Sequence, residues 1–154
     1  FIAKFRKYFA MNLVGILLSK EIFKPKVFQT VSQIGYSYKG KTLSGDLATK
    51  QKLKFETGDR LPFIGDKYYM NFMEASFQLL HINNKSLDSH TSQQIKNLFP
   101  FPVKVIENKI EQWNKFGVKS ELFVLVRPDN YIALILDMFD ETKIKKYLLK
   151  YFHT

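Results

Sequence analysis

Residues Leu125 to Ala133 read L-V-R-P-D-N-Y-I-A and predict a tight β-hairpin. Pro128 fixes φ at the first corner of the turn, and Asn130 tolerates the left-handed backbone that a three-residue hairpin loop requires. Apolar runs flank this turn at 122–126 and 131–136. Because neither run alternates with polar residues, we expect both strands to be buried on both faces of a sheet.

Around the hairpin, the apolar periodicity alternates between strands and helices. It predicts strands at 77–82 and 103–106, a short helix or turn at 68–74, and helices at 91–98, at 110–116 and after Asp140. The two strands of a strand–helix–strand unit are parallel and are joined by a right-handed connection, so the strands at 77–82 and 103–106 should be parallel. The two strands of a hairpin are antiparallel. The predicted fold class is therefore α/β, a thioredoxin-like mixed sheet in the order β-α-β, connecting helix, β-β-α.

The N-terminal third has a different character. Helical spacing of apolar residues predicts helices within 1–33, then a short strand at 34–38 and a lysine-rich linker at 39–57. We therefore divide the chain into residues 1–57, a helical segment with a linker, and residues 58–154, the thioredoxin-like domain.

Composition limits the classes of function. The chain has 154 residues, of which 45% are hydrophobic and 16% aromatic, so it is long and apolar enough to fold. It contains no cysteine, which excludes disulfides, thiolate catalysis and zinc–thiolate sites. Its three histidines make a multi-histidine metal site improbable.

The positive charge is concentrated near the N-terminus. Residues 1–55 hold 11 Lys and Arg against 2 Asp and Glu, whereas residues 56–154 hold 13 against 12. Such a basic segment can face an acidic partner domain, form a solvated surface, or bind nucleic acid or anionic lipid. The apolar run Tyr8–Leu18 is too short for a membrane span, and no signal-cleavage site follows it. Because the chain begins with Phe1, we expect a fragment of a longer, cytoplasmic protein.

Several polar residues invite a catalytic interpretation. Asp88, Ser89 and His90 are consecutive, but a nucleophile, a base and its orienting group rarely converge from one turn, so a helix N-cap is favoured. His81 lies within an apolar strand and is expected to be a hydrogen-bonded structural histidine. Asp137 and Asp140 bracket a strand end and a helix start, where carboxylates satisfy free backbone N–H groups.

Aromatic residues near lysines suggest a surface on which nucleic-acid bases could stack. Because no RNA-binding motif accompanies these residues, we expect them to lie in the core or at a domain contact; they are Tyr36, Tyr38, Tyr68 and Tyr69. Redox-active thioredoxin-like proteins carry a thiol pair after the first strand and a cis-proline before the hairpin. Here residues 83–90 lack the thiols and residues 118–121 lack the proline. Thiol–disulfide exchange is therefore excluded.

Two short motifs resemble one protein family. Gly58-Asp59-Arg60-Leu61-Pro62 and the 125–133 hairpin resemble the G-(D/x)-R-x-P and L-V-R-P-D-G-Y-I-A segments of FAD-dependent aromatic monooxygenases of the phenol hydroxylase type. In that family these segments open and close a C-terminal thioredoxin-like domain. Asn130 replaces the usual glycine, but both residues accept a left-handed turn. Residues 32–38 are similar to the family's strand after its last helix.

The resemblance implies a non-catalytic C-terminal piece of a monooxygenase. FAD and NAD(P)H would serve hydroxylation in the parent chain, and this piece would bind neither. No catalytic, cofactor-binding or metal-binding residue can be assigned, and the glycine-rich dinucleotide fingerprint is absent from this sequence. The implied partners are the rest of the monooxygenase and a second copy in a homodimer.

Two alternatives remain open at this point. One is a stand-alone, non-catalytic thioredoxin-fold module that binds a protein. The other is a basic binder of nucleic acid or a membrane surface, whose affinity would fall steeply with salt.

Overall fold

The computed structural model describes residues 37–40, 44–45, 47–65 and 75–152. The chain divides into two units between Tyr36 and Ser37, and all described residues belong to the second. The helices predicted within 1–33, the short element at 68–74 and the strand at 34–38, except for its last two residues, lie outside the described residues.

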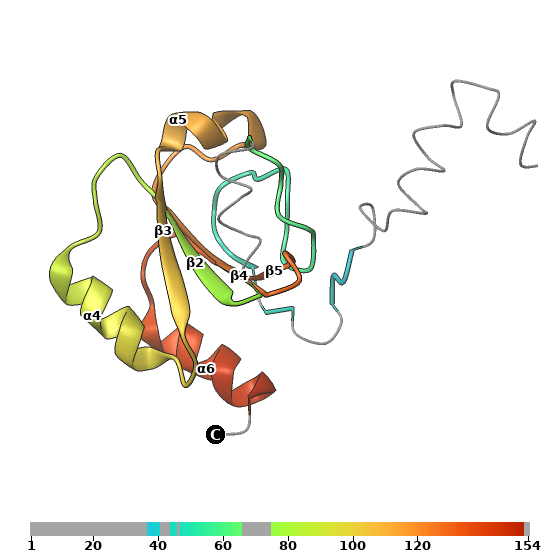
Figure 1. Ribbon diagram of the computed structural model, residues 1–154. Helices are drawn as coiled ribbons and strands as arrows, with labels where there is room; N and C mark the ends of the chain where they lie inside the picture. The colour runs from blue at the N-terminus through green and yellow to red at the C-terminus, as the bar shows by residue number, and fades with distance from the viewer. Residues whose placement is uncertain (1–36, 41–43, 46, 66–74, 153–154) are drawn as a thin grey trace, which may run out of the picture. The chain divides into compact units, whose positions relative to one another are not determined.

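A five-stranded mixed sheet forms the centre of the described unit (Figure 1). The strands lie in the order β1-β5-β4-β2-β3. Only β4 is antiparallel to its neighbours; β1, β2, β3 and β5 run in one direction. The bounds are Leu47–Ala48 for β1, Phe77–Ile82 for β2, Val103–Asn108 for β3, Leu122–Val126 for β4 and Ile132–Leu136 for β5. This arrangement confirms the predicted thioredoxin-like α/β fold.

The β4–β5 hairpin has the predicted turn. The Asn130 amide donates to the Arg127 carbonyl at 2.9 Å, and Asn130 has a φ of +65°. All ten residues of the two strands are buried. The pairing shifts register between Leu125 and Val126, so that the consecutive residues Ala133 and Leu134 contribute to the same face.

Four helical segments accompany the sheet: α4 at Ser89–Leu98, α5 at Ile110–Trp113, the 3-10 segment η2 at Asn114–Phe116, and α6 at Glu141–Tyr151. Asp88 caps α4 by accepting from the Thr91 amide at 2.8 Å, and Asp140 caps α6 by accepting from the Lys143 amide at 3.0 Å. Gly117 ends η2 in the left-handed conformation, with a φ of +91°.

Both faces of the sheet carry an apolar core. Figure 1 shows α4 and α6 on the same side, where Ile95, Ile144 and Leu148 pack against alternate strand residues. Trp113 of α5 lies on the opposite face together with Phe55. Phe55 is 3% exposed and comes from the stretch that the sequence suggests is a linker. Residues 44–57, where described, are therefore part of the folded unit.

The outer edge of β5 is covered by this same N-terminal stretch. β1 pairs with the end of β5, and Arg60 forms an antiparallel bridge with Tyr131 at its start. The Gly58 amide donates to the Ile132 carbonyl at 2.8 Å, and the Ile132 amide donates to the Asp59 carbonyl at 2.8 Å. β5 therefore has partners on both sides, and its outer side is not open to association with another strand.

Candidate functional site

Polar side chains gather at one edge of the sheet, where the four parallel strands end. Thr49 follows β1, Asn83 follows β2, Asn108 ends β3 and Asp137 follows β5. Because β4 runs in the opposite direction, Glu121 at its start lies at the same edge. In open α/β sheets this carboxyl edge is where ligands usually bind.

His81 is tied into this edge by a carboxylate. Its Nε2 lies 2.8 Å from Glu121 Oε1, which also accepts from Asn83 Nδ2 at 2.7 Å. The imidazole is 2% exposed and stacks on Phe123 with ring centroids 4.7 Å apart. A ring so enclosed has no access to a substrate, which confirms the expectation of a hydrogen-bonded structural histidine.

Asp137 has a similar tethering role. Its carboxylate accepts from the Thr49 hydroxyl, from the Lys50 amide at 2.9 Å and from Gln51 Nε2 at 3.2 Å. Burial raises the pKa of this carboxyl, but the hydrogen bonds from Thr49, Lys50 and Gln51 outweigh it and bring the pKa below its ordinary value. Asp137 therefore holds the chain that follows β1 rather than capping a helix, while Asp140 provides the cap.

The Asp88-Ser89-His90 cluster does not form a catalytic arrangement. Asp88 is engaged as the α4 cap, and hydrogen bonds from Thr91 lower the pKa of its carboxyl. Ser89 and His90 are exposed at the start of the helix. The N-cap interpretation is confirmed. Of the four tyrosines expected in the core or at a domain contact, Tyr38 packs edge-on against Tyr131 at 4.8 Å between ring centroids, and Tyr36, Tyr68 and Tyr69 lie outside the described residues.

A polar hollow of about 470 Å³ opens beside β2 and β3 at this edge. It is lined by the loop 83–86 and by Glu107, Asn108, Lys109 and Gln112. Asn108 is 4% exposed, and neither its side-chain oxygen nor its nitrogen has a hydrogen-bond partner among the described residues. Leaving a buried amide unpaired costs about 1–3 kcal/mol, so this residue requires an explanation.

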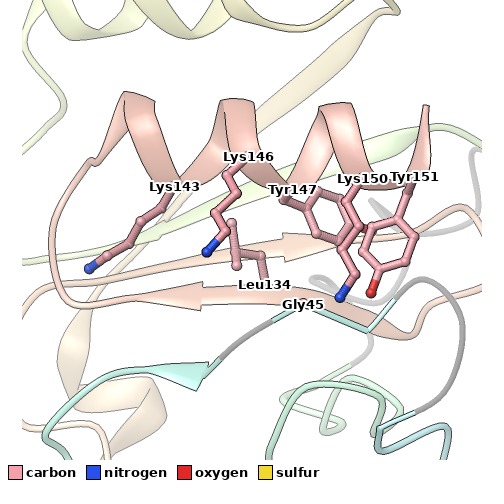
Figure 2. A pocket seen from close by; sticks show the side chains of 7 residues that line it. All are labelled: Gly45, Leu134, Lys143, Lys146, Tyr147, Lys150 and Tyr151. Carbon is pink, nitrogen blue, oxygen red and sulfur yellow. The ribbon is translucent and has the colours of Figure 1, made fainter. Parts of the chain in front are cut away.

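A second hollow, of about 370 Å³, lies between α6 and β5 (Figure 2). Figure 2 shows Lys143, Lys146 and Lys150 extending from α6 over Leu134 and Gly45. Tyr147 and Tyr151 form part of its wall, and the Tyr151 hydroxyl donates to the Ser44 carbonyl at 2.9 Å. Burial raises the pKa of the Tyr147 hydroxyl well above its ordinary value, so this phenol stays protonated and is no acid–base group near neutral pH.

Within the described part of the chain, no three His, Asp or Glu side chains lie close enough to hold a metal ion. None of the helices among these residues has the length and apolarity that a bilayer crossing requires.

Sequence reasoning did not find Asn108, Gln51 or Glu121. Glu121 is an isolated acid in a polar stretch, and its partners His81 and Asn83 lie about 40 residues away in the sequence. For Asn108, one signal was present in the sequence. Extending the predicted strand at 103–106 by two residues would have placed Asn108 at the carboxyl edge of the sheet, opposite Ile82.

Comparison with known proteins finds no family model and no characterised protein that matches the chain. Two solved structures, both of RebC, are similar to this chain. "Structure of the rebeccamycin biosynthetic enzyme RebC with reduced flavin" is 16% identical over 75% of this chain, with a TM-score of 0.49. "Chromopyrrolic acid-soaked RebC-10x with bound 7-carboxy-K252c" is 15% identical over 73%, also with a TM-score of 0.49. In both cases the chain spans 22% of the RebC chain.

Proposed function

We propose that this chain is the C-terminal part of an FAD-dependent monooxygenase and that its own role is structural. In the parent enzyme, NAD(P)H would reduce the flavin and the flavin would hydroxylate an aromatic compound. The flavin supplies the redox chemistry in such enzymes, and the protein positions it. The thioredoxin-like domain would brace the flavin-binding body and contribute to a homodimer.

The observation that carries this proposal is the pairing of the two motifs. Gly58–Pro62 and the hairpin at 125–133 are separated by more than 60 residues in the sequence, yet they lie side by side. Besides the two hydrogen bonds at Ile132, the Leu61 amide donates to the Asn130 carbonyl at 2.8 Å. The two similar segments therefore form one structural unit, as expected if both were inherited together rather than matched by chance.

Gly58 shows why this motif needs its glycine. Its φ is +89°, and a Cβ atom there would lie 2.5 Å from the Lys39 nitrogen. Only glycine suits both the left-handed backbone and the close approach of this second segment. The motif thus fixes how this segment passes the β4–β5 hairpin, which is a structural task.

The test is the coding sequence upstream of Phe1 and the behaviour of the protein it encodes. We expect a strand–G-x-G-x-x-G–helix unit there, and a yellow, FAD-containing parent enzyme. Deleting residues 58–154 from that parent should lower its thermal stability and disrupt the dimer without removing the residues that contact FAD. An open reading frame that starts near Met11 would contradict the proposal and favour a stand-alone binding module.

A further inference from the structure

We propose that the polar hollow at the carboxyl ends of β2 and β3 binds a small organic anion whose body carries hydroxyl groups, such as a sugar phosphate or a hydroxy acid. This site does not depend on the identity of the parent enzyme. Three observations suggest it: the topology of the sheet, a buried side-chain amide without hydrogen-bond partners among the described residues, and the charge around the hollow.

The topology makes this a favoured position for a ligand. After β2 the chain leads to α4, which packs on one face of the sheet, and after β3 it leads to α5, which packs on the other. Two adjacent parallel strands whose connections leave toward opposite faces define a switch point, and the crevice outside their carboxyl ends is the usual ligand site of open α/β sheets. Its volume of about 470 Å³ lies within the range of small-molecule sites.

The walls of the hollow are held together across the switch point. The backbone N–H of Asn83 donates to the backbone carbonyl of Asn108 at 2.9 Å, and the backbone N–H of Leu87 donates to Glu107 Oε1 at 2.6 Å. The Ile110 amide donates to Asn84 Oδ1 at 3.2 Å. These bonds fix the two loops relative to each other, so a ligand would meet a largely preformed site and lose less entropy on binding.

Asn108 is the residue that points to a ligand. Asn108 belongs to the lining of the hollow, is 4% exposed, and has both polar atoms of its side chain unpaired among the described residues. A leucine or valine at this strand position would avoid that cost, so stability does not account for the asparagine. An amide that donates and accepts at once would suit the hydroxyl groups of a ligand, and unpaired polar groups of this kind are typical of binding sites.

The charge of the lining selects an anion. Lys85 and Lys109 are exposed at the rim, whereas Glu107, the single acid of the lining, is engaged with the Leu87 amide. Ser86 adds a hydroxyl, and no described lining residue is apolar. A phosphate or carboxylate near the Lys85 and Lys109 ammonium groups, with a hydroxylated body against the Asn108 side chain, would suit these three residues.

The test uses the full chain and three probes: glucose 6-phosphate, inorganic phosphate and glucose. Backbone amide chemical shifts are recorded by NMR during titration. We expect saturable shifts at residues 83–86 and 107–112 with glucose 6-phosphate, weaker ones with inorganic phosphate, and none that saturate with glucose. Tartrate, a hydroxy acid, distinguishes a carboxylate from a phosphate preference. Absence of saturable shifts with both anionic probes, or shifts centred on Lys143, Lys146 and Lys150, would overturn the proposal.

Two variants separate binding from folding. Asn108→Ala should weaken binding about tenfold while leaving the melting temperature unchanged or higher, because it removes an unpaired buried amide. Lys85→Gln with Lys109→Gln should also weaken binding about tenfold. Lys96→Gln, an exposed substitution in α4 that removes one charge elsewhere, should stay within about twofold. An Asn108→Ala protein that binds normally, or that melts several degrees lower, would show a purely structural role.

Discussion

Each face of the sheet carries a buried apolar core, but the two faces are covered in different ways. On one face, α4 and α6 supply their own backbone hydrogen bonds and present apolar stripes to the strands. On the other, the cover is the short α5–η2 segment and the irregular stretch 51–65. This second cover depends on hydrogen bonds between segments that are distant in the sequence. One example is the bond from the Lys54 backbone N–H to the Phe116 carbonyl at 2.9 Å. A helix pairs its own backbone groups, whereas an irregular cover needs a separate tertiary partner for each of them.

Trp113→Ala should produce the largest effect, because this residue anchors the irregular cover. The indole is completely buried and packs edge-on against Phe55 at 5.9 Å between ring centroids. We expect a loss of about 3–5 kcal/mol in the free energy of unfolding, measured by urea titration. Phe116→Ala, at a half-buried neighbour of Trp113, should cost less. A loss below that of Phe116→Ala would mean that Trp113 is not the anchor.

Adjacent residues of β2 allow a direct comparison of the two faces. Leu79 lies on the helix-covered face and Leu80 on the irregular one, and both are fully buried. Leu79→Ala should cost about 3–4 kcal/mol, and Leu80→Ala about 1 kcal/mol less, since an irregular cover can collapse further into the cavity. Urea titrations of the two proteins measure the difference. Equal losses would show that both covers are equally rigid.

The difference between the covers also explains how much of the fold the sequence predicts. The bounds of β2 and β4, the caps Asp88 and Asp140, and the left-handed Asn130 follow from local patterns and are confirmed. Each depends on residues close in sequence, or on a periodicity that matches one regular element.

The irregular cover could not be predicted in this way. Phe55 is a single aromatic residue in a lysine-rich stretch without periodicity, so nothing local marks it as part of the core. Gln51 accepts from the Lys119 amide at 2.8 Å, about 68 residues away, and no sequence pattern indicates such a bond. The same limit applies to Asn108: the apolar pattern predicts a strand only to residue 106, whereas β3 continues to a buried Asn108.

Glycine substitutions test how tightly the irregular cover is fitted. A Cβ at Gly117 would lie 2.3 Å from the Lys52 carbonyl oxygen, and its φ is +91°. Gly117→Ala should therefore cost about 2–3 kcal/mol, from backbone strain and from displacement of the Lys52 segment. Gly40 has a φ of +66° but nothing within 4 Å, so Gly40→Ala reports the strain alone, about 1 kcal/mol. Equal effects in thermal denaturation would mean that Lys52 moves without cost.

Asp137→Asn should have the smallest effect on the free energy of unfolding, and the size of this effect should depend on pH. Its carboxylate holds the residues after β1, and an amide can accept from only some of those donors, so we expect a loss of about 1 kcal/mol at neutral pH. Because hydrogen bonds lower the pKa of Asp137 in the folded protein, its contribution is fully present above the unfolded-state pKa of about 4 and disappears as the pH falls through the folded value.

The asparagine variant lacks this proton linkage, so the stabilities of the two proteins should converge as the pH is lowered from 6 toward 3. Urea titrations across that range measure the convergence, with Glu111→Gln, at an exposed residue of α5, as the control. A stability difference that stays constant down to pH 3 would show that Asp137 contributes through its shape rather than its charge.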